Sequence, residues 1–382
     1  MRQRLLALML LLPFLAASSA LADRPSVPTP APPSIGAPSY ILMDKDSGQI
    51  LSERDPDEQR EPASLVKLMT AYVVFSEISE GQLDLDEEVP ISEQAWRMGG
   101  SRMFLEVGRR VAVEDLLRGM IIQSGNDASV ALAEHVAGNE DTFAQLMNQY
   151  AEQLGMENTN FTNATGWPDP DQLTTARDIA LLARAMIDDF PEFYQFYSER
   201  EFTFNDITQR NRNSLLWRDD SVDGLKTGHT QSAGYNLVSS AERDDMRLIS
   251  VVMGTDSARD RMQQTQSLFG YGFRFFGTYR LYDHDTALAE PKLWRGGSDT
   301  LAVGLHEPLY VTIPRREYDN MEATMHLRST IVAPISRGDE MGTLEVTIGD
   351  ATIAEIPLVA LEDGEEGGFF GRVIDDIMLR FQ

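Results

Sequence analysis

The sequence predicts a mixed α/β fold, with an antiparallel sheet flanked by helices, followed by a small all-β domain and a terminal amphipathic helix. Three observations predict it. Apolar-periodic segments typical of helices accompany a few strand-like segments up to about residue 276. Short alternating segments separated by turns dominate from about residue 298, and apolar residues recur at helical spacing from Phe369 onward. With 382 residues, the chain is long enough for two or three domains.

Residues 1–22 have the pattern of a cleaved export signal. Two arginines precede an apolar run from Leu5 to Ala17, and Ala20-Leu21-Ala22 fits the small-residue cleavage pattern. The run is shorter than the roughly 20 residues that a membrane span needs, so we expect cleavage rather than an anchor. Residues 23–38 contain six prolines and predict an extended linker.

Residues 39–283 are predicted to form the main domain and residues 284–362 the β-rich domain. The predicted elements of the main domain are a β-hairpin (40–53), a helix entered at Pro62 (63–78), a helical segment with one interruption (113–136), a further helix (175–187), a strand pair (235–254) and a helix behind it (258–276). In the β-rich domain, alternation predicts strands at 309–313, 323–327 and 344–348.

The terminal segment, residues 363–382, has two interpretations. From Phe369 to Phe381 the apolar residues fill one half of a helix, which suits an amphipathic helix on a membrane surface. The alternative is a helix docked on its own domain. Four acidic residues just before the helix weaken the membrane interpretation, since such helices usually carry a basic face.

Composition excludes several classes of function. Sixty acidic residues against 33 basic ones give a net charge of −27, which argues against a nucleic-acid partner. The absence of cysteine excludes disulfides, a cysteine nucleophile and thiolate zinc sites. With only five histidines scattered along the chain, we expect no metal site and no cofactor.

Ser64-Leu65-Val66-Lys67 stands at the start of the first long predicted helix. A spacing of three residues places the Ser64 hydroxyl and the Lys67 amine on one face. A serine becomes a good nucleophile when a base removes its proton, and a lysine is such a base if burial or a nearby cation lowers its pKa. Alone the pair is a weak signal, since an ordinary surface serine and lysine give the same pattern.

Two further motifs follow, Ser124-Gly125-Asn126 and Lys226-Thr227-Gly228, the latter directly before His229. The chain has only four lysines, and two of them fall in the first and third motifs. Three motifs in this order indicate one shared site rather than coincidence. Because His229 directly follows the third motif, we expect a substrate-side or structural histidine rather than a member of a Ser-His-Asp triad.

The three motifs resemble the Ser-x-x-Lys, Ser-Asp-Asn and Lys-Thr-Gly signature of class A β-lactamases and penicillin-binding proteins. Gly125 replaces the aspartate of the second motif, as is usual in the carboxypeptidase branch. Segments 100–105, 211–217 and 271–276 resemble the same branch. The chain is therefore similar, over essentially all its mature length, to low-molecular-weight penicillin-binding proteins that act as D-alanyl-D-alanine carboxypeptidases, which implies a β-lactamase/transpeptidase-like domain.

The resemblance implies a role for each matched residue. Ser64 would attack the penultimate D-alanine of a peptidoglycan stem peptide, with Lys67 as general base and Ser124 as proton relay to the leaving amine. Asn126 would bind the substrate amide or hold Lys67, and Lys226 would keep Lys67 neutral by repulsion and attract the substrate carboxylate. The other implied substrate-binding residues are Thr227, Gly228, His229, Arg212 and Arg261, with Ser64 and His229 supplying the backbone N–H groups of an oxyanion hole.

The implied partners are peptides that end in D-Ala-D-Ala, β-lactam antibiotics and, through the terminal helix, the periplasmic face of the bacterial inner membrane. Three alternatives remain. A β-lactamase is disfavoured because segment 163–177 offers no glutamate for deacylation. An endopeptidase would use the same motifs, and a non-catalytic penicillin-binding wall protein is disfavoured by the intact Ser64, Lys67 and Lys226.

Overall fold

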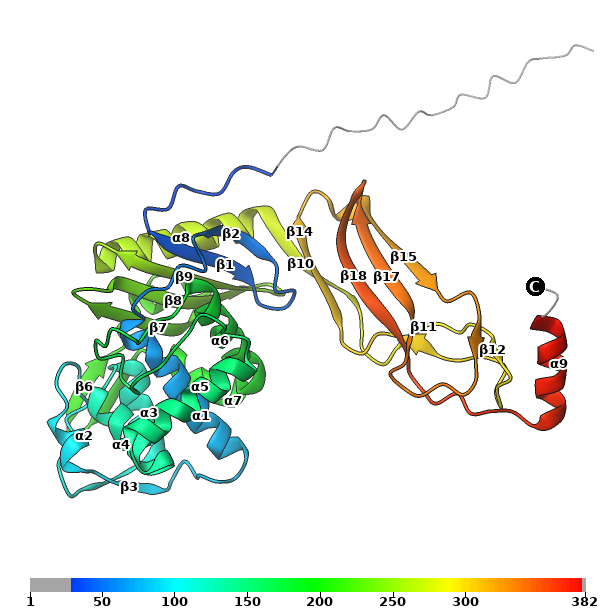
Figure 1. Ribbon diagram of the computed structural model, residues 1–382. Coiled ribbons are helices and arrows are strands. Elements are labelled where there is room, and N and C mark those ends of the chain that lie inside the picture. The colour runs from blue at the N-terminus through cyan, green and yellow to red at the C-terminus, as the bar shows by residue number, and fades with distance from the viewer. Residues whose placement is uncertain (1–28, 380–382) are drawn as a thin grey trace, which may run out of the picture.

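The computed structural model describes residues 29–379, which form a main domain, a β domain and a terminal helix (Figure 1). The predicted export signal, residues 1–22, lies outside the described residues, as do the first residues of the predicted linker and residues 380–382. The mixed α/β class, the separate β domain and the terminal helix are confirmed.

The main domain is built on a five-stranded antiparallel sheet in the order β2-β1-β9-β8-β7. Its strands are β1 (Ser39–Asp44), β2 (Ile50–Arg54), β7 (Val222–Thr230), β8 (Gly234–Arg243) and β9 (Met246–Thr255). The predicted hairpin and strand pair are β1–β2 and β8–β9. Strand β7, which carries the third motif, pairs only with β8 among the described strands and is therefore an edge strand.

Helices cover both faces of this sheet. Helix α8 packs on one face against Leu42 and Leu248, while the remaining helices form a larger core against Ile41 and Ile249 on the other. Neighbouring strand residues thus enter different cores, because side chains alternate across a strand. The helices are α1 (Val66–Ser79), α2 (Glu93–Arg97), α3 (Val113–Ile122), α4 (Asn126–Ala137), α5 (Glu140–Gln153), α6 (Ala176–Asp189), α7 (Pro191–Tyr194) and α8 (Ala258–Phe275).

Shorter elements connect these. Two small hairpins, β3–β4 and β5–β6, lie outside the main sheet, and 3-10 turns precede α1 and follow α7. Their bounds are β3 (Glu88–Pro90), β4 (Arg110–Ala112), β5 (Glu201–Phe204), β6 (Ile207–Arg210), η1 (Ala63–Leu65), η2 (Gln195–Ser198) and η3 (Ser214–Trp217).

Residues 29–38 have no regular secondary structure, as their prolines predict, yet they lie against the main domain rather than free of it. Ile35 and Ala37 are buried, and the Ala37 N–H donates to Gln264 Oε1 of α8 at 2.7 Å. Burial of the apolar side chains of Ile35 and Ala37 stabilises this docked position, which an exposed linker would not have.

The β domain holds a five-stranded sheet in the order β11-β13-β18-β17-β15. Strand β10 leaves α8 directly and pairs with β14, so the paired strands of this domain start at Phe276, before the predicted boundary at residue 284. Its elements are β10 (Phe276–Tyr282), β11 (Ala287–Ala289), β12 (Leu293–Trp294), β13 (Val303–Gly304), β14 (Leu309–Pro314), η4 (Tyr318–Asn320), β15 (Met321–Leu327), β16 (Ile331–Val332), β17 (Glu340–Ile348) and β18 (Ala351–Ala360).

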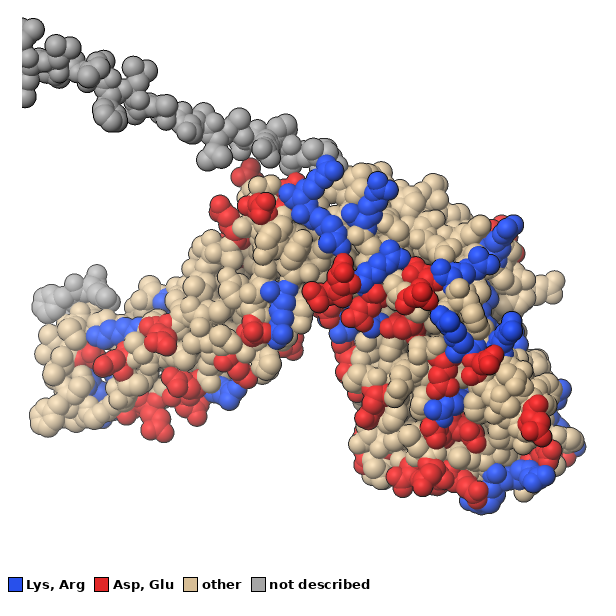
Figure 2. Space-filling view, turned by 180° about the vertical axis from the view of Figure 1, so that it is seen from behind, with Lys and Arg blue, Asp and Glu red and all other residues tan. Residues whose placement is uncertain are grey.

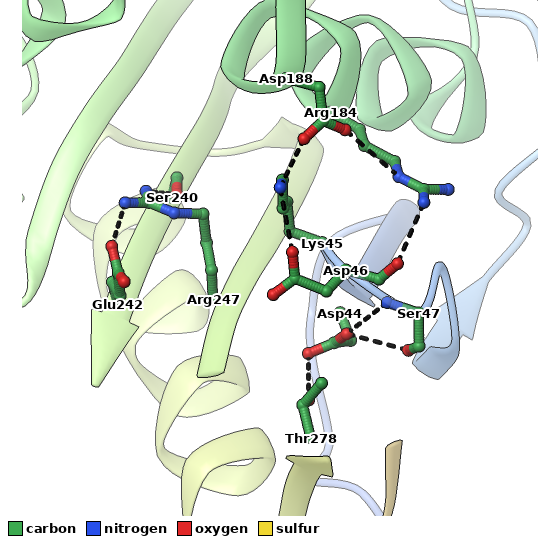
Figure 3. Close-up of polar contacts among 10 residues, drawn as sticks. All are labelled: Asp44, Lys45, Asp46, Ser47, Arg184, Asp188, Ser240, Glu242, Arg247 and Thr278. Atoms are coloured by element: carbon green, nitrogen blue, oxygen red, sulfur yellow. Dashed lines mark hydrogen bonds and ion pairs between the residues drawn. The ribbon is translucent and has the colours of Figure 1, made fainter. Parts of the chain in front are cut away.

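A buried polar cluster joins the two domains at the turn of the β1–β2 hairpin (Figure 3). Asp44 accepts hydrogen bonds from the Ser47 hydroxyl at 2.9 Å and from the Thr278 hydroxyl of β10 at 2.5 Å. Thr312 of β14 lies within hydrogen-bonding distance of Ser47 and Thr278. A cavity of about 830 Å³ lies beside this junction, between the hairpin and β14–β18, and none of the motif residues lines it.

Helix α9 (Phe369–Leu379) lies at the end of the β domain farthest from the main domain (Figure 1). Asp375 accepts the Arg295 backbone N–H at 2.7 Å, and Asp376 pairs with the Arg295 side chain. The apolar residues stay exposed, with Phe370 at 83%. Residues 364 and 366 form β-bridges with the β domain, so the helix begins later than the predicted segment. No described helix has the length and apolar character to cross a membrane.

Acidic side chains are distributed over both lobes of the molecule, interspersed with arginines (Figure 2). Many form surface ion pairs. Arg177 contacts Asp57 at 2.7 Å and Glu53 at 3.1 Å, and the hydrogen bond from Arg177 lowers the pKa of Asp57. On this face the acidic residues are therefore spread over both lobes rather than gathered into one patch.

Candidate active site

Ser64 lies in the 3-10 turn η1 at the entrance to α1, between β7 and the loop that contains Gly166. The preceding residue, Ala63, has a left-handed backbone with φ of 48°, a conformation that non-glycine residues adopt at an energetic cost. A Cβ on Gly166 would lie 1.9 Å from the Ala63 carbonyl oxygen, and one on Gly228 would lie 2.8 Å from the Pro62 carbonyl oxygen. Glycine is therefore required on both sides so that two backbones can press against the turn that presents Ser64.

The resemblance implies that Gly228 is a substrate-binding residue, and the structure gives this glycine a further role. In the structure, a side chain at that position would collide with the turn before Ser64.

Lys67 is almost completely buried, with 1% of its surface exposed, and its amine joins the first and second motifs. Nζ lies 3.2 Å from Ser64 Oγ and 2.7 Å from Asn126 Oδ1, and it also donates to the Thr165 carbonyl oxygen. Asn126 donates its amide N–H to the Gly99 carbonyl oxygen at 2.8 Å, which fixes its orientation. Of the two roles expected for Asn126, the contact with Lys67 is present in the structure.

Burial lowers the pKa of Lys67 to about 7, and the positive charge of Arg212 contributes to the decrease. The resemblance also implies a repulsion between Lys226 and Lys67, and this repulsion acts on the pKa of Lys226. The pKa of Lys226 is itself well below its usual value, first because of burial and then because of Lys67, Arg212 and Arg261. A bound carboxylate would add a negative charge and so favour the protonated form of Lys226.

Ser124 lies in the turn between α3 and α4 with φ of 66°. Its hydroxyl is buried and has no hydrogen-bond partner among residues 29–379. It lines the same cavity, of about 370 Å³, as Ser64. A buried hydroxyl without a partner is costly in a folded protein, and such groups occur where a substrate or water supplies the missing bond. The other residues lining this cavity are Ser101, Arg212, Thr227, Gly228, His229 and Arg261.

Two arginines line the cavity on the side of β7. Arg261 of α8 donates to the Gly228 carbonyl oxygen at 2.9 Å and lies over the Tyr235 ring, and Arg212 donates to the Gln123 carbonyl oxygen at 3.0 Å. His229 is exposed and its ring stacks on Tyr235, with the ring centroids 3.9 Å apart. These contacts fit the expected substrate-side position of His229.

The structure therefore brings together every residue that the three motifs and the arginine matches singled out. It also shows contributors that the sequence analysis missed. Asp127 accepts the backbone N–H groups of residues 103–105, at 3.0–3.1 Å, and holds the segment beside Asn126. The sequence feature that could have marked Asp127 is its position directly after the second motif. Thr165 contributes only a carbonyl oxygen, which no sequence pattern marks.

No group of three or more side chains that could ligate a metal occurs among the described residues. The site combines the Ser64 hydroxyl beside the low-pKa amine of Lys67, the buried hydroxyl of Ser124 and two arginines that line the cavity. That set suits nucleophilic attack on a carbonyl of a substrate with a free carboxylate.

Comparison with known proteins agrees with this geometry. Residues 26–257 match the family model "D-alanyl-D-alanine carboxypeptidase", and residues 276–366 match "Penicillin-binding protein 5, C-terminal domain". D-alanyl-D-alanine carboxypeptidase DacC of Escherichia coli is 44% identical over 96% of this chain and 93% of its own. A D-alanyl-D-alanine endopeptidase of the same organism is 33% identical over 65% of this chain and 80% of its own.

A solved structure gives the same result. Penicillin binding protein 5 from Haemophilus influenzae is 41% identical, covers 88% of this chain and 99% of its own, and superposes with a TM-score of 0.86. Both domains of the present chain are therefore found together in this relative. The chain belongs to the D-alanyl-D-alanine carboxypeptidase family, whose members with this two-domain structure are low-molecular-weight penicillin-binding proteins.

Proposed function

We propose that this serine carboxypeptidase removes the terminal D-alanine of peptidoglycan pentapeptides through an acyl-enzyme on Ser64, and that it binds penicillins at the same serine. The observation that carries the proposal is the position of the Lys67 amine, buried, with a pKa of about 7, and 3.2 Å from Ser64 Oγ. At neutral pH about half of an amine with that pKa is unprotonated and able to act as a base.

Acylation then follows from the contacts. The Lys67 lone pair takes the proton of Ser64 Oγ while this oxygen bonds to the carbonyl carbon of the penultimate D-alanine. The backbone N–H groups of Ser64 and His229 stabilise the resulting oxyanion. As the carbon–nitrogen bond breaks, the leaving amine takes the proton of the Ser124 hydroxyl, which Lys67 replaces with the proton taken from Ser64. This relay requires Ser124 and Lys67 to come together in the substrate complex, because the Ser124 hydroxyl has no hydrogen-bond partner among the described residues. Water then attacks the ester by the same route and releases the shortened peptide and free Ser64.

Substrate orientation depends on β7 and the cations. The outer edge of β7 can accept an extended peptide as an added strand. Lys226, Thr227 and the two arginines lie where its C-terminal carboxylate would end. In this arrangement Gly228 and His229 flank the scissile bond. Asn126 holds Lys67 beside Ser64 through a hydrogen bond from the Lys67 amine.

A two-step assay tests the function. We expect a fluorescent penicillin to label the protein covalently, and a stem pentapeptide to yield a tetrapeptide and D-alanine by mass spectrometry. Labelling without D-alanine release would support a non-catalytic role. Rapid loss of the label, on the timescale of labelling itself, would favour a β-lactamase, and cleavage of a crosslinked peptide dimer would reveal endopeptidase activity.

The rate of acylation should depend on pH through Lys67. The neutral amine is the active form, so acylation should rise with pH through the pKa of about 7 and level off above it. Below about pH 6 the rate should fall about tenfold per pH unit, because only the unprotonated fraction acts as a base. Stopped-flow measurement of penicillin acylation from pH 5 to 9 provides the profile. A rate that stays constant over this range would contradict the role of Lys67.

We further propose that the chain is exported and lies at the periplasmic face of the inner membrane, held there by α9. Support comes from the amino-terminal signal pattern and from the exposed apolar residues of α9, which include Phe369 and Phe370 at 68% and 83% exposure. Its acidic residues Asp375 and Asp376 face the β domain. The helix thus offers apolar side chains outward and keeps its negative charges away from a lipid surface.

Deleting residues 369–382 should release the protein from membranes while leaving penicillin labelling unchanged. The residues that line the cavity all belong to the main domain, and α9 lies at the far end of the β domain (Figure 1). Arg372 is paired with Glu366 at 2.6 Å, so binding should depend on apolar insertion and change little with salt. Co-sedimentation with phospholipid vesicles measures this. A full-length variant with Phe369→Ser and Phe370→Ser tests the same prediction without shortening the chain, and it should also lose binding to the vesicles. Undiminished sedimentation of both variants would favour the docking interpretation.

A further inference from the structure

Glu140, which the motifs do not mark, lies close to the base of the proposed reaction. It is the first residue of α5, directly after the capping residue Asn139, and its side chain is partly buried. A glutamate at this position can remain in water and still interact with the helix dipole. Here its carboxylate is instead directed toward the segment that contains Thr165, because Oε1 accepts the Ala164 backbone N–H at 3.0 Å.

This hydrogen bond belongs to a short chain of contacts that ends at Lys67. The Ala164 carbonyl oxygen accepts the hydroxyl of Thr70 at 2.7 Å, which ties the same residue to α1. The next carbonyl oxygen, that of Thr165, accepts a hydrogen bond from Lys67 Nζ. Glu140 and Thr70 therefore hold Ala164 from both sides and leave the adjacent carbonyl directed at the Lys67 amine.

The charges around Lys67 give Glu140 a second role. Arg212 lowers the pKa of Lys67, and the positive charges of Lys67 and Lys226 repel each other, whereas Asp127 and Glu140 supply the nearby negative charges that raise the pKa of Lys67. The Asp127 carboxylate already accepts the N–H groups of residues 103–105. Glu140 accepts a single backbone N–H among the described residues. Burial raises the pKa of Glu140, with smaller increases from Glu134 and Asp141, while Ala164 N–H and Lys67 oppose it.

We propose that Glu140 is a positioning residue for Lys67. Glu140 holds the Thr165 carbonyl group against the Lys67 amine, and its negative charge counteracts the positive charges near Lys67. This inference depends on the proposed role of Lys67 as the base. Glu140 does not line the cavity that contains Ser64, so it acts through Lys67 and not on the substrate or on water. It therefore contributes to the pH at which the base becomes neutral, together with burial, Arg212 and Asp127.

The isosteric variant Glu140→Gln separates the two roles. Its amide oxygen can still accept the Ala164 N–H, but the charge is removed, so the protonated form of Lys67 loses support. We expect the acid limb of the acylation profile to move to lower pH by about half a unit or more, with little change in rate on the plateau. Glu140→Ala also removes the hydrogen bond, and we expect the plateau rate to fall about tenfold. Recovery of that rate in Glu140→Gln is the expected rescue.

Asp141→Asn is the matched control, because Asp141 is an acidic residue of the same first turn, is exposed, and is not among the charges that act on Lys67. Its profile should coincide with that of the wild type. An unchanged acid limb in Glu140→Gln, or an equal shift in Asp141→Asn, would overturn the electrostatic role. A full plateau rate in Glu140→Ala would overturn the positioning role. Thermal unfolding of Glu140→Gln checks that this variant is folded. A wild-type acylation rate that does not change with pH would contradict the proposed function of Lys67 and not the role of Glu140.

Discussion

Ser64→Ala is expected to abolish covalent penicillin labelling and to reduce D-alanine release by about 10⁴-fold or more. The hydroxyl is the atom that forms the acyl bond, and none of the other hydroxyls lining the cavity lies within hydrogen-bonding distance of Lys67 in the described structure. Gel fluorescence after incubation with a labelled penicillin measures the first effect. Release of D-alanine from a pentapeptide, followed by mass spectrometry, measures the second.

The control for this prediction is Ser79→Ala, at the opposite end of α1. Ser79 donates only to the Ser76 carbonyl oxygen within its own helix, so this variant should label normally. Ser64→Ala should also keep its cooperative thermal unfolding, because it removes one oxygen from a cavity wall and not from a packed core. Persistent labelling of a folded Ser64→Ala protein would refute the assignment of the nucleophile.

Lys67→Arg should reduce acylation by about 10³-fold, although it conserves positive charge. A guanidinium group keeps its proton at any working pH, so it cannot accept the proton of Ser64. Lys67→Ala should show a comparable loss, and it avoids forcing a larger group into a site that is 1% exposed. Near-normal acylation rates in both variants would contradict the role of Lys67 as base. The measurement is stopped-flow acylation at a pH above 8, where the wild-type amine is neutral.

Lys45→Arg is the matched control for this second prediction. Lys45 lies at the domain junction, where it pairs with Asp46 and Asp188 (Figure 3). Burial acts to lower its pKa, but these two carboxylates outweigh that effect and raise it. Arginine can retain both ion pairs, so activity should be unchanged. The two lysines illustrate that partial burial beside carboxylates raises the pKa of an amine, whereas full burial beside a cation lowers it.

Several features of the fold could be predicted because they depend on local patterns. The hairpin around Gly48, the helix that starts near Pro62 and the helical segment interrupted at Ser124 all follow from periodicity and turn residues. The order of the strands could not be predicted in this way. Strand β10 follows α8 without a break and pairs with β14 of the next domain, and such a pairing depends on residues distant in sequence.

The sequence by itself predicted which residues would carry the chemistry, because nucleophilic attack on a peptide needs particular side chains and these occur in three motifs. The tertiary structure decided how those side chains behave. Lys67 has its low pKa because several elements bury it and Arg212 approaches it, and its contact with Thr165 comes from a backbone carbonyl. Glu140 became visible only through its hydrogen bond to Ala164. Protonation equilibria depend on burial and on charges summed over distant segments, and a linear motif contains neither.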